Sequence, residues 1–524
     1  MNVAELLEQQ ARTRPDQIAI IETGEQGEVQ ISYAQLQQAV LHASGFFEQQ
    51  GLRQGQAVLL FQPMSICLYV YLLACFRLGL IAMFIDPGMG RSYIAQCCSI
   101  FPPSALLASP KAHLLRLVSP ALRKIPLKFS TGIWLPATRS ANWQDKKLYS
   151  DRCVSGESDI ALLSFTSGST GKPKCAARSH DFLLAQSHVL IKSLSLLEKQ
   201  LDMNSLPVFV LANLAAGLTS LIPAGDLRKP SDLDAQALIQ QIEKHKPDRI
   251  SAPPSLMENI ADTCIKQGLS LNEKIRFFTG GAPVFPRLLK KLADVAPRAD
   301  ITAVYGSTEA EPIAHIEFHQ ISGNDFVAMG EGRGLLAGHV IDDIDLRIIR
   351  SEVDVSVGQL RAEQFLQMTQ GDHDTGEIVV SGGHVLKGYL HGVGDSETKF
   401  LVDGVVWHRT GDMGYLDDRR RLWLLGRQKA VVNDRHGDTY PFSIECAAMQ
   451  NPAVKRAAFL SWQGKRLLVI EAEASFHKDS MKTLLFKEKI DQLLMITKMP
   501  LDRRHHAKIN YPEIKHWLAK QSAT

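Results

Sequence analysis

The sequence predicts an α/β protein. It has a large N-terminal domain, made of two α/β subdomains and a barrel-like β subdomain, and a small α+β C-terminal domain. Three observations lead to this prediction. Short apolar strand candidates alternate with amphipathic helices from the N-terminus to Tyr305. The segment 339–430 instead carries short strands with hairpin-like breaks, and a new strand and helix pattern starts after Arg427. Strands that alternate with helices indicate parallel sheets covered on both faces.

Composition places the chain among ordinary globular proteins. Of its 524 residues, 45% are hydrophobic and 22% are charged, which excludes disordered, collagen-like and mucin-like classes. The length exceeds what one hydrophobic core usually supports, so two or more domains are expected. The formal net charge is only +3, with 58 Lys and Arg against 55 Asp and Glu. That balance gives no general field for nucleic acid, and no nucleic-acid partner is predicted.

Cysteine usage and the first residues predict a cytoplasmic protein. The eight cysteines are scattered, with no CxxC pair and no His/Cys cluster at metal spacing, which is typical of a reducing compartment. The opening segment, MNVAELLEQQARTRPDQ, has no basic patch followed by an apolar stretch. No signal peptide is therefore predicted.

The segment 65–84, SICLYVYLLACFRLGLIAMF, is long and apolar enough to be compared with a membrane span. Arg77 lies inside it, and a central arginine is costly in a bilayer. We therefore predict a buried strand at 58–62, a buried helix at 65–78 and a second strand at 80–85, with no transmembrane segment.

The remaining elements follow from periodicity and from start and stop signals. Ser32 and Gln35 form a capping-box pattern before a helix that ends at Gly51. Strands are predicted at 105–107, 160–165, 208–211, 249–252, 274–279 and 301–305, and helices at 233–244 and 285–292.

The second half is predicted to change character. Its strands, at 343–349, 377–381, 405–409 and 421–425, suggest an antiparallel or barrel-like subdomain. The small domain is predicted to hold strands at 455–460 and 466–473 and a helix at 482–496. The predicted boundary separates residues 1–427 from residues 428–524.

A loop rich in glycine, hydroxyl groups and lysine follows the strand predicted at 160–165. It reads TSGSTGKPK over residues 166–174. Glycines let the backbone approach phosphate, hydroxyls donate to its oxygens, and lysines neutralise its charge. It is not a Walker P-loop, because Thr166 replaces the first glycine and Pro173 follows the lysine. A nucleotide triphosphate is the natural ligand, and a flexible surface loop is the alternative.

This loop resembles the signature loop of the adenylate-forming superfamily, which includes acyl-CoA synthetases, peptide-synthetase adenylation domains and firefly luciferase. Other segments resemble motifs of that family in the same order: GGAP at 280–283, YGSTE at 305–309, GEI at 376–378 with GYL at 388–390, TGD at 410–412, GR at 426–427, and Lys508. The resemblance covers nearly the whole chain. It implies that ATP and a carboxylate give acyl-AMP and pyrophosphate. It also implies a mobile C-terminal domain that swings about a hinge at Lys429.

The resemblance also implies roles for individual residues. Lys508, Thr308 and Glu309 are the implied catalytic residues. Lys508 would bridge the carboxylate and α-phosphate oxygens, Thr308 would donate to the α-phosphate, and Glu309 would hold Mg²⁺. Asp412 would accept the ribose hydroxyls, and Arg427 would add a donor to the ribose or phosphate. The implied ATP and AMP site comprises Thr166, Ser167, Gly168, Ser169, Thr170, Gly171, Lys172, Lys174, Gly281, Ala282, Pro283, Tyr305, Gly306, Ser307, Thr308, Asp412 and Arg427. Taken singly, a TGD turn or a basic stretch around Lys508 is also an ordinary surface feature.

The acid is predicted to be apolar, and a fatty acid is the best match. Phe209, Val210 and Gly217, the predicted acyl-pocket residues, belong to an apolar stretch with no charge to pair an amino group. Val210 stands where most acyl-CoA synthetases carry a histidine. The alternative is that the strand predicted at 208–211 is simply core.

The ending of the chain leaves the second half-reaction open. The segment 502–509, DRRHHAKI, lacks the Pro-Arg-Thr-x-x-Gly-Lys ending of acyl-CoA synthetases and resembles that of the olefin-pathway β-lactone synthetases. We predict a ligase of fatty acid metabolism that uses ATP and Mg²⁺ and passes the acyl group to a thiol. Coenzyme A and an acyl carrier protein are the candidate acceptors. The alternatives are cyclisation of a β-hydroxy fatty acid to a β-lactone and a non-catalytic nucleotide- or lipid-binding relative.

Overall fold

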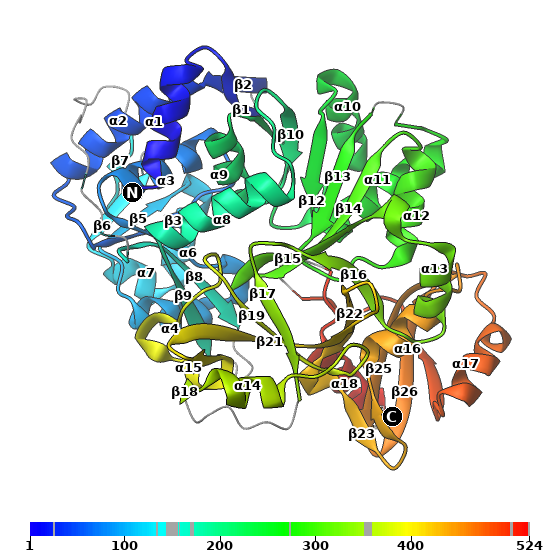
Figure 1. The fold of residues 1–524 in the computed structure, drawn as a ribbon. Coiled ribbons are helices and arrows are strands. Elements are labelled where there is room, and N and C mark those ends of the chain that lie inside the picture. Colours follow the sequence, from blue (N-terminus) through cyan, green and yellow to red (C-terminus); the bar gives the residue numbers. More distant parts are fainter. Residues whose placement is uncertain are drawn as a thin grey trace. The chain divides into compact units, whose positions relative to one another are not determined.

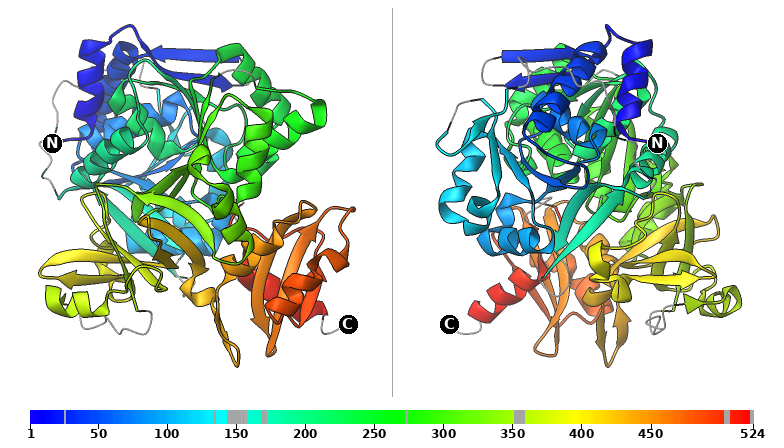
Figure 2. Two further views of the ribbon diagram at one scale, coloured as in Figure 1. Left: turned by 45° about the vertical axis from the view of Figure 1, so that its right-hand side comes forward. Right: turned by 90° about the vertical axis from the view of Figure 1, so that its left-hand side faces the viewer.

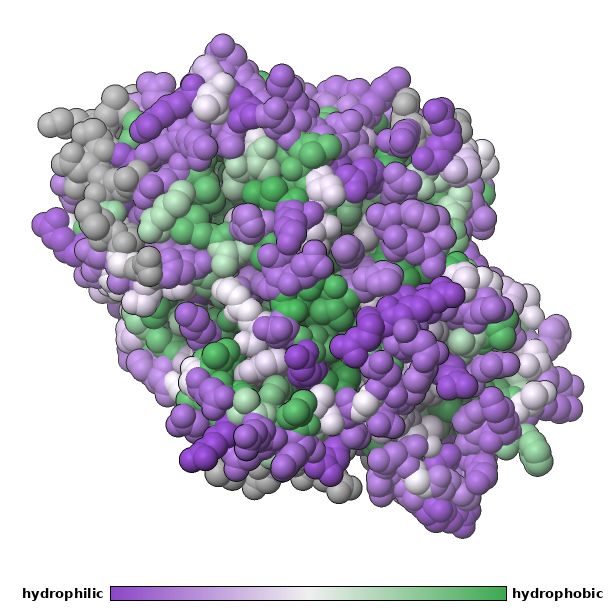
Figure 3. Space-filling view, viewed as in Figure 1, coloured by the Kyte–Doolittle hydropathy of each residue, from purple (hydrophilic) through white to green (hydrophobic). Residues whose placement is uncertain are grey.

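The computed structural model describes residues 1–24, 27–132, 135–142, 153, 156, 158–167, 172–271, 274–350, 359–502 and 507–521. Its contacts divide the chain into two compact units. Unit 1 comprises residues 1–251, 308–311 and 383–396, and unit 2 comprises residues 252–307, 312–382 and 397–524. Figures 1 and 2 trace the helices and strands of both units, and hydrophilic residues cover most of the face in Figure 3.

The first sheet of unit 1 has the strand order β7-β6-β5-β3-β4-β8-β9. All of its neighbours are parallel except β8 and β9, which form an antiparallel pair. Its strands are β3 (Ala57–Phe61), β4 (Ile81–Phe84), β5 (Ala105–Ala108), β6 (Leu127–Ser130), β7 (Arg139–Ser140), β8 (Ile160–Ser167) and β9 (Pro173–Ser179). Phe46, Phe47 and Tyr71, from the two helices α2 (Tyr33–Gln49) and α3 (Ile66–Arg77), pack with Phe129 of β6 in one apolar core. The parallel α/β architecture predicted for this part is confirmed.

A second set of strands in unit 1 has the order β12-β10-β11-β1-β2. These strands are β1 (Ile18–Gly24), β2 (Gly27–Ser32), β10 (Leu201–Asn204), β11 (Thr219–Ile222) and β12 (Arg249–Ala252). The other helices of unit 1 are α1 (Ala4–Thr13), α4 (Arg91–Ile100), α5 (Pro110–His113), α6 (Leu115–Val118), α7 (Pro120–Lys124), α8 (His180–Ser193), α9 (Pro207–Ala216) and α10 (Ala235–His245). Ser32 and Gln35 form the predicted capping box at the start of α2.

The apolar segment 65–84 folds as a buried helix followed by a buried strand, as predicted. Ser65 caps α3, and the chain leaves the helix before β4. Arg77 is buried and forms an ion pair with Glu8 of α1. Among the described residues, no helix is long and apolar enough to cross a membrane.

Unit 2 begins with two parallel strands and continues as an antiparallel ladder, in the order β13-β14-β15-β16-β22-β21-β19-β17. The strands are β13 (Arg276–Gly280), β14 (Asp300–Ser307), β15 (Ala310–Glu317), β16 (Leu335–Val340), β17 (Asp345–Ile349), β18 (Gln359–Leu360), β19 (Gly376–Ser381), β20 (Lys399–Val402), β21 (Val405–Leu416) and β22 (Arg421–Arg427). Its helices before residue 428 are α11 (Pro254–Gln267), α12 (Pro286–Val295), α13 (Gly323–Gly330), α14 (Ala362–Met368) and α15 (Asp395–Thr398). The antiparallel character predicted for 339–430 is confirmed.

The C-terminal part of unit 2 forms a separate three-stranded sheet in the order β25-β26-β27, beside a small hairpin of β23 and β24. Its elements are β23 (Val432–Asp434), β24 (Gly437–Thr439), α16 (Pro441–Ala448), β25 (Val454–Trp462), β26 (Lys465–Ala472), α17 (Lys482–Lys487), β27 (Gln492–Met495) and α18 (Tyr511–Gln521). The predicted domain boundary between residues 427 and 428 stays a prediction, since residues on both sides of it fall in unit 2.

Two sequence-based assignments are wrong. Residues 208–211 belong to the helix α9 and not to a strand. Pro207 occupies a first-turn position of this helix, and Gly217 ends it with a φ of 77°, a left-handed conformation that glycine adopts without strain. The apolar run is buried almost throughout, so it carries neither the period of a strand nor that of a surface helix.

The second wrong assignment is the single helix predicted at 482–496. The helix α17 ends at Lys487, and β27 then pairs in parallel with β26. Lys489 has a φ of 52°, which breaks the helix. Leu493 and Leu494 are therefore neighbours on opposite faces of a strand and do not share one helix face.

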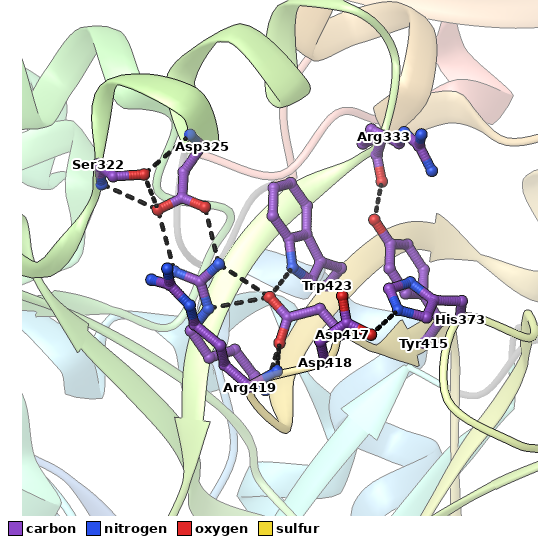
Figure 4. Close-up of polar contacts among 10 residues, drawn as sticks. Ser322, Asp325, Arg333, His373, Tyr415, Asp417, Asp418, Arg419 and Trp423 are labelled. Atoms are coloured by element: carbon purple, nitrogen blue, oxygen red, sulfur yellow. Dashed lines mark hydrogen bonds and ion pairs between the residues drawn. The ribbon is translucent and has the colours of Figure 1, made fainter.

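A buried ionic network fixes the turn between β21 and β22 (Figure 4). The guanidinium of Arg421 donates to both carboxylate oxygens of Asp325, at 2.7 and 2.9 Å, and to Asp417 at 2.9 Å. Burial alone would raise the pKa of Asp325, but the bonds from Arg421 and Ser322 outweigh it and lower that pKa to about 2. The network joins α13 to the hairpin whose open end carries the paired residues Asp412 and Arg427.

Candidate active site

Unit 2 contains a cavity of about 220 Å³ that gathers residues from five predicted motifs. Its motif residues are Gly281, Ala282, Pro283, Tyr305, Gly306, Asp412, Arg427 and Lys508. Its apolar walls include Val284, Phe285, Leu335, Leu336 and Phe442. These motif residues are separated by up to about 230 positions in the sequence, and the fold brings them around one space.

Asp412 is held at the end of the β21–β22 pairing, where it lies opposite Arg427. The hydroxyl of Tyr305 donates to Oδ2 of Asp412 at 2.8 Å, and Nε of Arg427 lies 3.1 Å from Oδ1. Arg427 also donates from Nη1 to the backbone oxygen of Thr410 at 2.8 Å. Burial, and then the charge of Asp412, hold the pKa of Tyr305 well above its usual range, so the phenol remains a donor. An ionised carboxylate has about four acceptor positions, so Asp412 retains capacity for ligand hydroxyls.

The GGAP turn forms the end of β13, where the chain turns toward α12. Gly281 has a φ of 79°, a left-handed conformation that favours glycine. The turn therefore places Ala282 and Pro283 along the cavity wall without side chains large enough to fill it.

Lys508 lines the cavity and belongs to the segment before α18. Oδ1 of Asp502 accepts from the backbone nitrogens of Lys508 and Ala507, at 2.9 and 3.2 Å. The backbone nitrogen of Asp502 in turn donates to the Lys508 oxygen at 2.7 Å, and Leu501 and Ile509 form a β-bridge. These hydrogen bonds and the β-bridge fix the backbone of Lys508.

A buried glutamate that belongs to none of the predicted motifs also lines this cavity. Glu445 of α16 accepts from the Phe459 backbone nitrogen at 3.0 Å and from the Tyr511 hydroxyl. Within the part of the chain that the structure describes, its second carboxylate oxygen, Oε2, is buried without a hydrogen-bond partner. Burial raises the pKa of Glu445 to about 7. The contacts of Glu445 span 14 and 66 residues, so no local pattern identifies them.

In unit 1, Glu309 is held by a tyrosine. The Tyr389 hydroxyl donates to Oε1 of Glu309 at 2.6 Å, and the Leu386 backbone nitrogen donates to the Glu309 backbone oxygen at 2.7 Å. Arg178 donates from Nη2 to the backbone oxygen of Thr308 at 3.0 Å. Tyr389 belongs to the GYL segment noted in the sequence, but its role as the partner of Glu309 was missed, as was that of Arg178.

Lys174 lies close to this group. Its Nζ is 5.5 Å from the centre of the Tyr389 ring, a cation–π distance. Lys174, Glu309 and Tyr389 therefore form a polar cluster in unit 1. Among the described residues, no group of three or more His, Cys, Asp and Glu side chains could hold a metal ion. A single carboxylate such as Glu309 nevertheless fits Mg²⁺, which binds through one or two carboxylates together with substrate phosphates.

The described residues of the predicted phosphate loop belong to, or directly precede, the antiparallel strands β8 and β9. Thr166 pairs with Lys174 across these strands, and Lys172 is exposed. Gly168, Ser169, Thr170 and Gly171, and the side chain of Ser167, lie outside the described residues. Ser307 ends β14 in unit 2, directly before Thr308 and Glu309 of unit 1.

The predicted acyl-pocket and hinge residues are not among those that line this cavity. Phe209 and Val210 are buried in α9, and Val210 belongs to the main apolar core of unit 1. Gly217 is the left-handed residue at the end of α9. Lys429 lies in a single turn of 3₁₀ helix, Gln428–Ala430, directly after β22. Their predicted roles stay predictions.

Comparison with known proteins agrees with this set of motifs. The sequence profile of the family described as AMP-binding enzyme matches residues 7–390. An olefin β-lactone synthetase from Xanthomonas campestris is 28% identical, and the match covers 99% of this chain and 98% of that protein. A peroxisomal OPC-8:0-CoA ligase from Arabidopsis thaliana is 25% identical over 83% of this chain and 77% of its own. Among solved structures, an anthranilate CoA ligase in complex with anthranoyl-AMP has a TM-score of 0.84 at 16% identity. That match covers 100% of this chain and 98% of the ligase.

The chain belongs to the AMP-binding enzyme family, the adenylate-forming superfamily that its motifs resemble. It is an ATP-dependent, AMP-forming acid ligase with the α/β fold of that family. Its substrate is a small-molecule carboxylic acid.

Proposed function

We propose that this enzyme activates a β-hydroxy fatty acid with ATP and closes the resulting acyl-AMP to a β-lactone. The observation that carries the proposal is the similarity to an olefin β-lactone synthetase over 99% of this chain. The segment 502–509 supports it, because it departs from the ending of acyl-CoA synthetases just before Lys508.

In the first step, a carboxylate oxygen of the acid bonds to the α-phosphorus, and the bond between the α- and β-phosphates breaks. Asp412 and Arg427 bind the ribose, and the GGAP turn lies against the adenine. Lys508 neutralises the negative charge that develops on the oxygens between the acid and the α-phosphate. Electrostatic stabilisation of this kind is usually the largest contribution to catalysis of such a step. Lys172, Lys174 and the hydroxyls of the loop bind the departing pyrophosphate. Glu309 would hold Mg²⁺, which would supply charge neutralisation at the phosphates.

In the second step, the β-hydroxyl oxygen of the same molecule bonds to the acyl carbon. The bond from that carbon to AMP breaks, and the hydroxyl proton passes to the departing phosphate or to water. Because both reacting groups belong to one bound molecule, the step needs no entry of an acceptor and gains from fixed proximity. The cysteine content of the chain supports a cytoplasmic setting.

A second candidate function is transfer of the acyl group to a thiol. The similarity to a peroxisomal OPC-8:0-CoA ligase favours it. In this case coenzyme A or an acyl carrier protein supplies a sulfur nucleophile that displaces AMP.

Mass spectrometry of the products distinguishes the two functions. The purified enzyme is incubated with a 3-hydroxy fatty acid, ATP and Mg²⁺, with and without coenzyme A. Lactone formation predicts a product one water lighter than the acid, with equal yield in both reactions. The matched acid without the 3-hydroxyl should stop at acyl-AMP. A thioester that requires coenzyme A, with no lactone in either reaction, would contradict the proposal and support the second candidate.

A further inference from the structure

One stretch of unit 1 carries positive charge with no acidic residue of its own. The segment 87–144 contains no Asp or Glu, although the whole chain is nearly balanced in charge. Seven Lys and Arg residues lie in it: Arg91, Lys111, Arg116, Arg123, Lys124, Lys128 and Arg139. None of them contributes to the candidate active site.

Within this segment, three large aliphatic side chains are exposed. Leu114, Leu117 and Val118 are 60%, 73% and 49% exposed. Leu114 has helical backbone angles and joins α5 to α6. The three residues therefore have the i, i+3 and i+4 spacing of one helix face, and exposed Lys111 lies one turn before Leu114 on that face.

Basic groups surround these side chains. Arg123 of α7 donates from Nη1 to the Leu117 backbone oxygen at 3.3 Å. Arg116 donates from Nη2 to the Pro136 oxygen at 3.1 Å. Contacts join α5 to α6 and α6 to α7, and the last two helices are labelled in Figure 1.

These charges lack carboxylate partners among the described residues. No ion pair recorded there involves Lys111, Arg116, Arg123 or Lys124. The hydrogen bond from Arg228, at 2.6 Å, is the main cause that lowers the pKa of Asp226, and the charge of Lys111 makes only the smallest contribution. Burial first, and then the charges of Arg116 and Lys128, lower the pKa of His113. Within the described part of the chain, positive charge is therefore concentrated on this segment.

We propose that Lys111, Leu114, Leu117, Val118, Arg123 and Lys124, the basic–apolar face, dock onto an anionic lipid bilayer. Exposed aliphatic side chains enter the boundary between headgroups and acyl chains, and the surrounding cations interact with anionic headgroups. The positive charge would also attract a nucleic acid. Proteins hold single strands by stacking bases on aromatic side chains, however, and a duplex offers no apolar phase for three aliphatic side chains. The chemistry of the face therefore favours a membrane surface. This inference does not depend on which acceptor the enzyme uses.

Co-sedimentation with lipid vesicles tests this assignment. Vesicles of phosphatidylcholine alone are compared with vesicles that also contain phosphatidylglycerol, at low and high salt. The full-length protein should bind the anionic vesicles at low salt and dissociate as salt rises, because salt screens exposed charges. The variant K111E/R123E/K124E should reduce the partition coefficient at least about tenfold. The variant L114S/L117S/V118S should also bind more weakly while retaining the salt dependence.

A matched control separates the face from net charge. The variant K266E/K465E/K478E changes three exposed lysines elsewhere and alters the net charge by the same amount. It should bind vesicles as the parent protein does. All variants should keep the parent's circular dichroism and its pyrophosphate release with a soluble acid. The proposal is overturned if the parent protein ignores anionic vesicles, or if the face variant and the control bind equally. Binding of a duplex oligonucleotide that requires the face, without vesicle binding, would assign it to nucleic acid.

Discussion

The hydroxyl of Tyr305 donates a 2.8 Å hydrogen bond to Oδ2 of Asp412, 107 residues away in the sequence. Together with Arg427, which lies 3.1 Å from Oδ1, it fixes the orientation of this carboxylate in the wall of the cavity. A carboxylate oriented in advance loses little entropy when it accepts ligand hydroxyls, which is the property needed to bind a ribose.

The first prediction concerns this carboxylate. Asp412→Ala should raise the dissociation constant for ATP at least tenfold, because hydrogen bonds to a charged group are each worth about 1.5–3 kcal/mol. Isothermal titration calorimetry with ATP measures it. Tyr305→Phe is the matched comparison. It removes one orienting hydroxyl and leaves the charge, so its effect should be clearly smaller. An unchanged constant in Asp412→Ala would mean that Asp412 only closes a turn.

The second prediction concerns Lys508. Lys508→Ala should lower the rate of adenylation by at least about 10²-fold, the loss expected when one preorganised donor is removed from a transition state. The dissociation constant for ATP should change little. Acid-dependent exchange of pyrophosphate into ATP measures the step. Lys515→Ala, which removes an exposed lysine of α18, serves as the control and should retain the parent rate. Parent-like exchange in Lys508→Ala would refute the assigned role.

The third prediction follows from the buried carboxyl of Glu445. Its folded-state pKa of about 7 lies above the 4.5 of an ordinary glutamate. Between these values the folded protein keeps a proton that the unfolded chain has lost, so this group lowers stability as pH rises from about 4.5 to 7. Glu445→Gln removes that titration. Its free energy of unfolding relative to the parent should therefore rise by up to about 3 kcal/mol between pH 5 and pH 8.

Urea denaturation of both proteins across this pH range measures the difference. Glu445→Gln keeps an acceptor oxygen for Tyr511, so the comparison isolates the charge. A difference that stays constant from pH 5 to pH 8 would show that Glu445 is not protonated near neutrality.

The fourth prediction concerns the ionic network of Figure 4. Asp325→Ala should lower the free energy of unfolding by about 3 kcal/mol, because it leaves the buried guanidinium of Arg421 with an incomplete set of partners. The exposed pair of Arg420 and Asp372 offers the control, and Arg420→Ala should cost less than about 1 kcal/mol. Urea unfolding of both variants measures the contrast. Equal losses would mean that burial of the Asp325 pair adds nothing.

Much of the fold followed from local signals in the sequence. The capping box of Ser32 and Gln35, the strand–helix alternation and the break after Arg77 were each visible within a few residues, and each was confirmed. The helix α9 was missed because it is apolar on nearly every face. It therefore lacks the hydrophobic periodicity that distinguishes a helix from a strand. The strand β27 was missed because its pairing with β26 is a tertiary contact.

The site divides in the same way. Asp412, Arg427 and Lys508 belong to recognisable motifs, and the structure brings them to one cavity. Glu445 and Tyr511 belong to none, and their contact joins two helices 66 residues apart. Tyr389 was part of a motif, but its hydrogen bond to Glu309 joins residues that are 80 positions apart in the sequence, so no local pattern indicates it. Sequence patterns identified residues that line the cavity more readily than the partners that orient candidate site residues.

The transfer of carboxylate oxygen atoms from the acid to AMP and to the lactone tests the proposed chemistry most directly. A 3-hydroxy fatty acid with ¹⁸O in both carboxylate oxygens is incubated with the enzyme, ATP and Mg²⁺, and the products are examined by mass spectrometry. Ring closure through acyl-AMP predicts one ¹⁸O in AMP and one ¹⁸O in the lactone, at its carbonyl, with an unlabelled ring oxygen from the hydroxyl. A lactone that retains both ¹⁸O atoms, with unlabelled AMP, would show that the hydroxyl and not the carboxylate is activated, and would contradict the account.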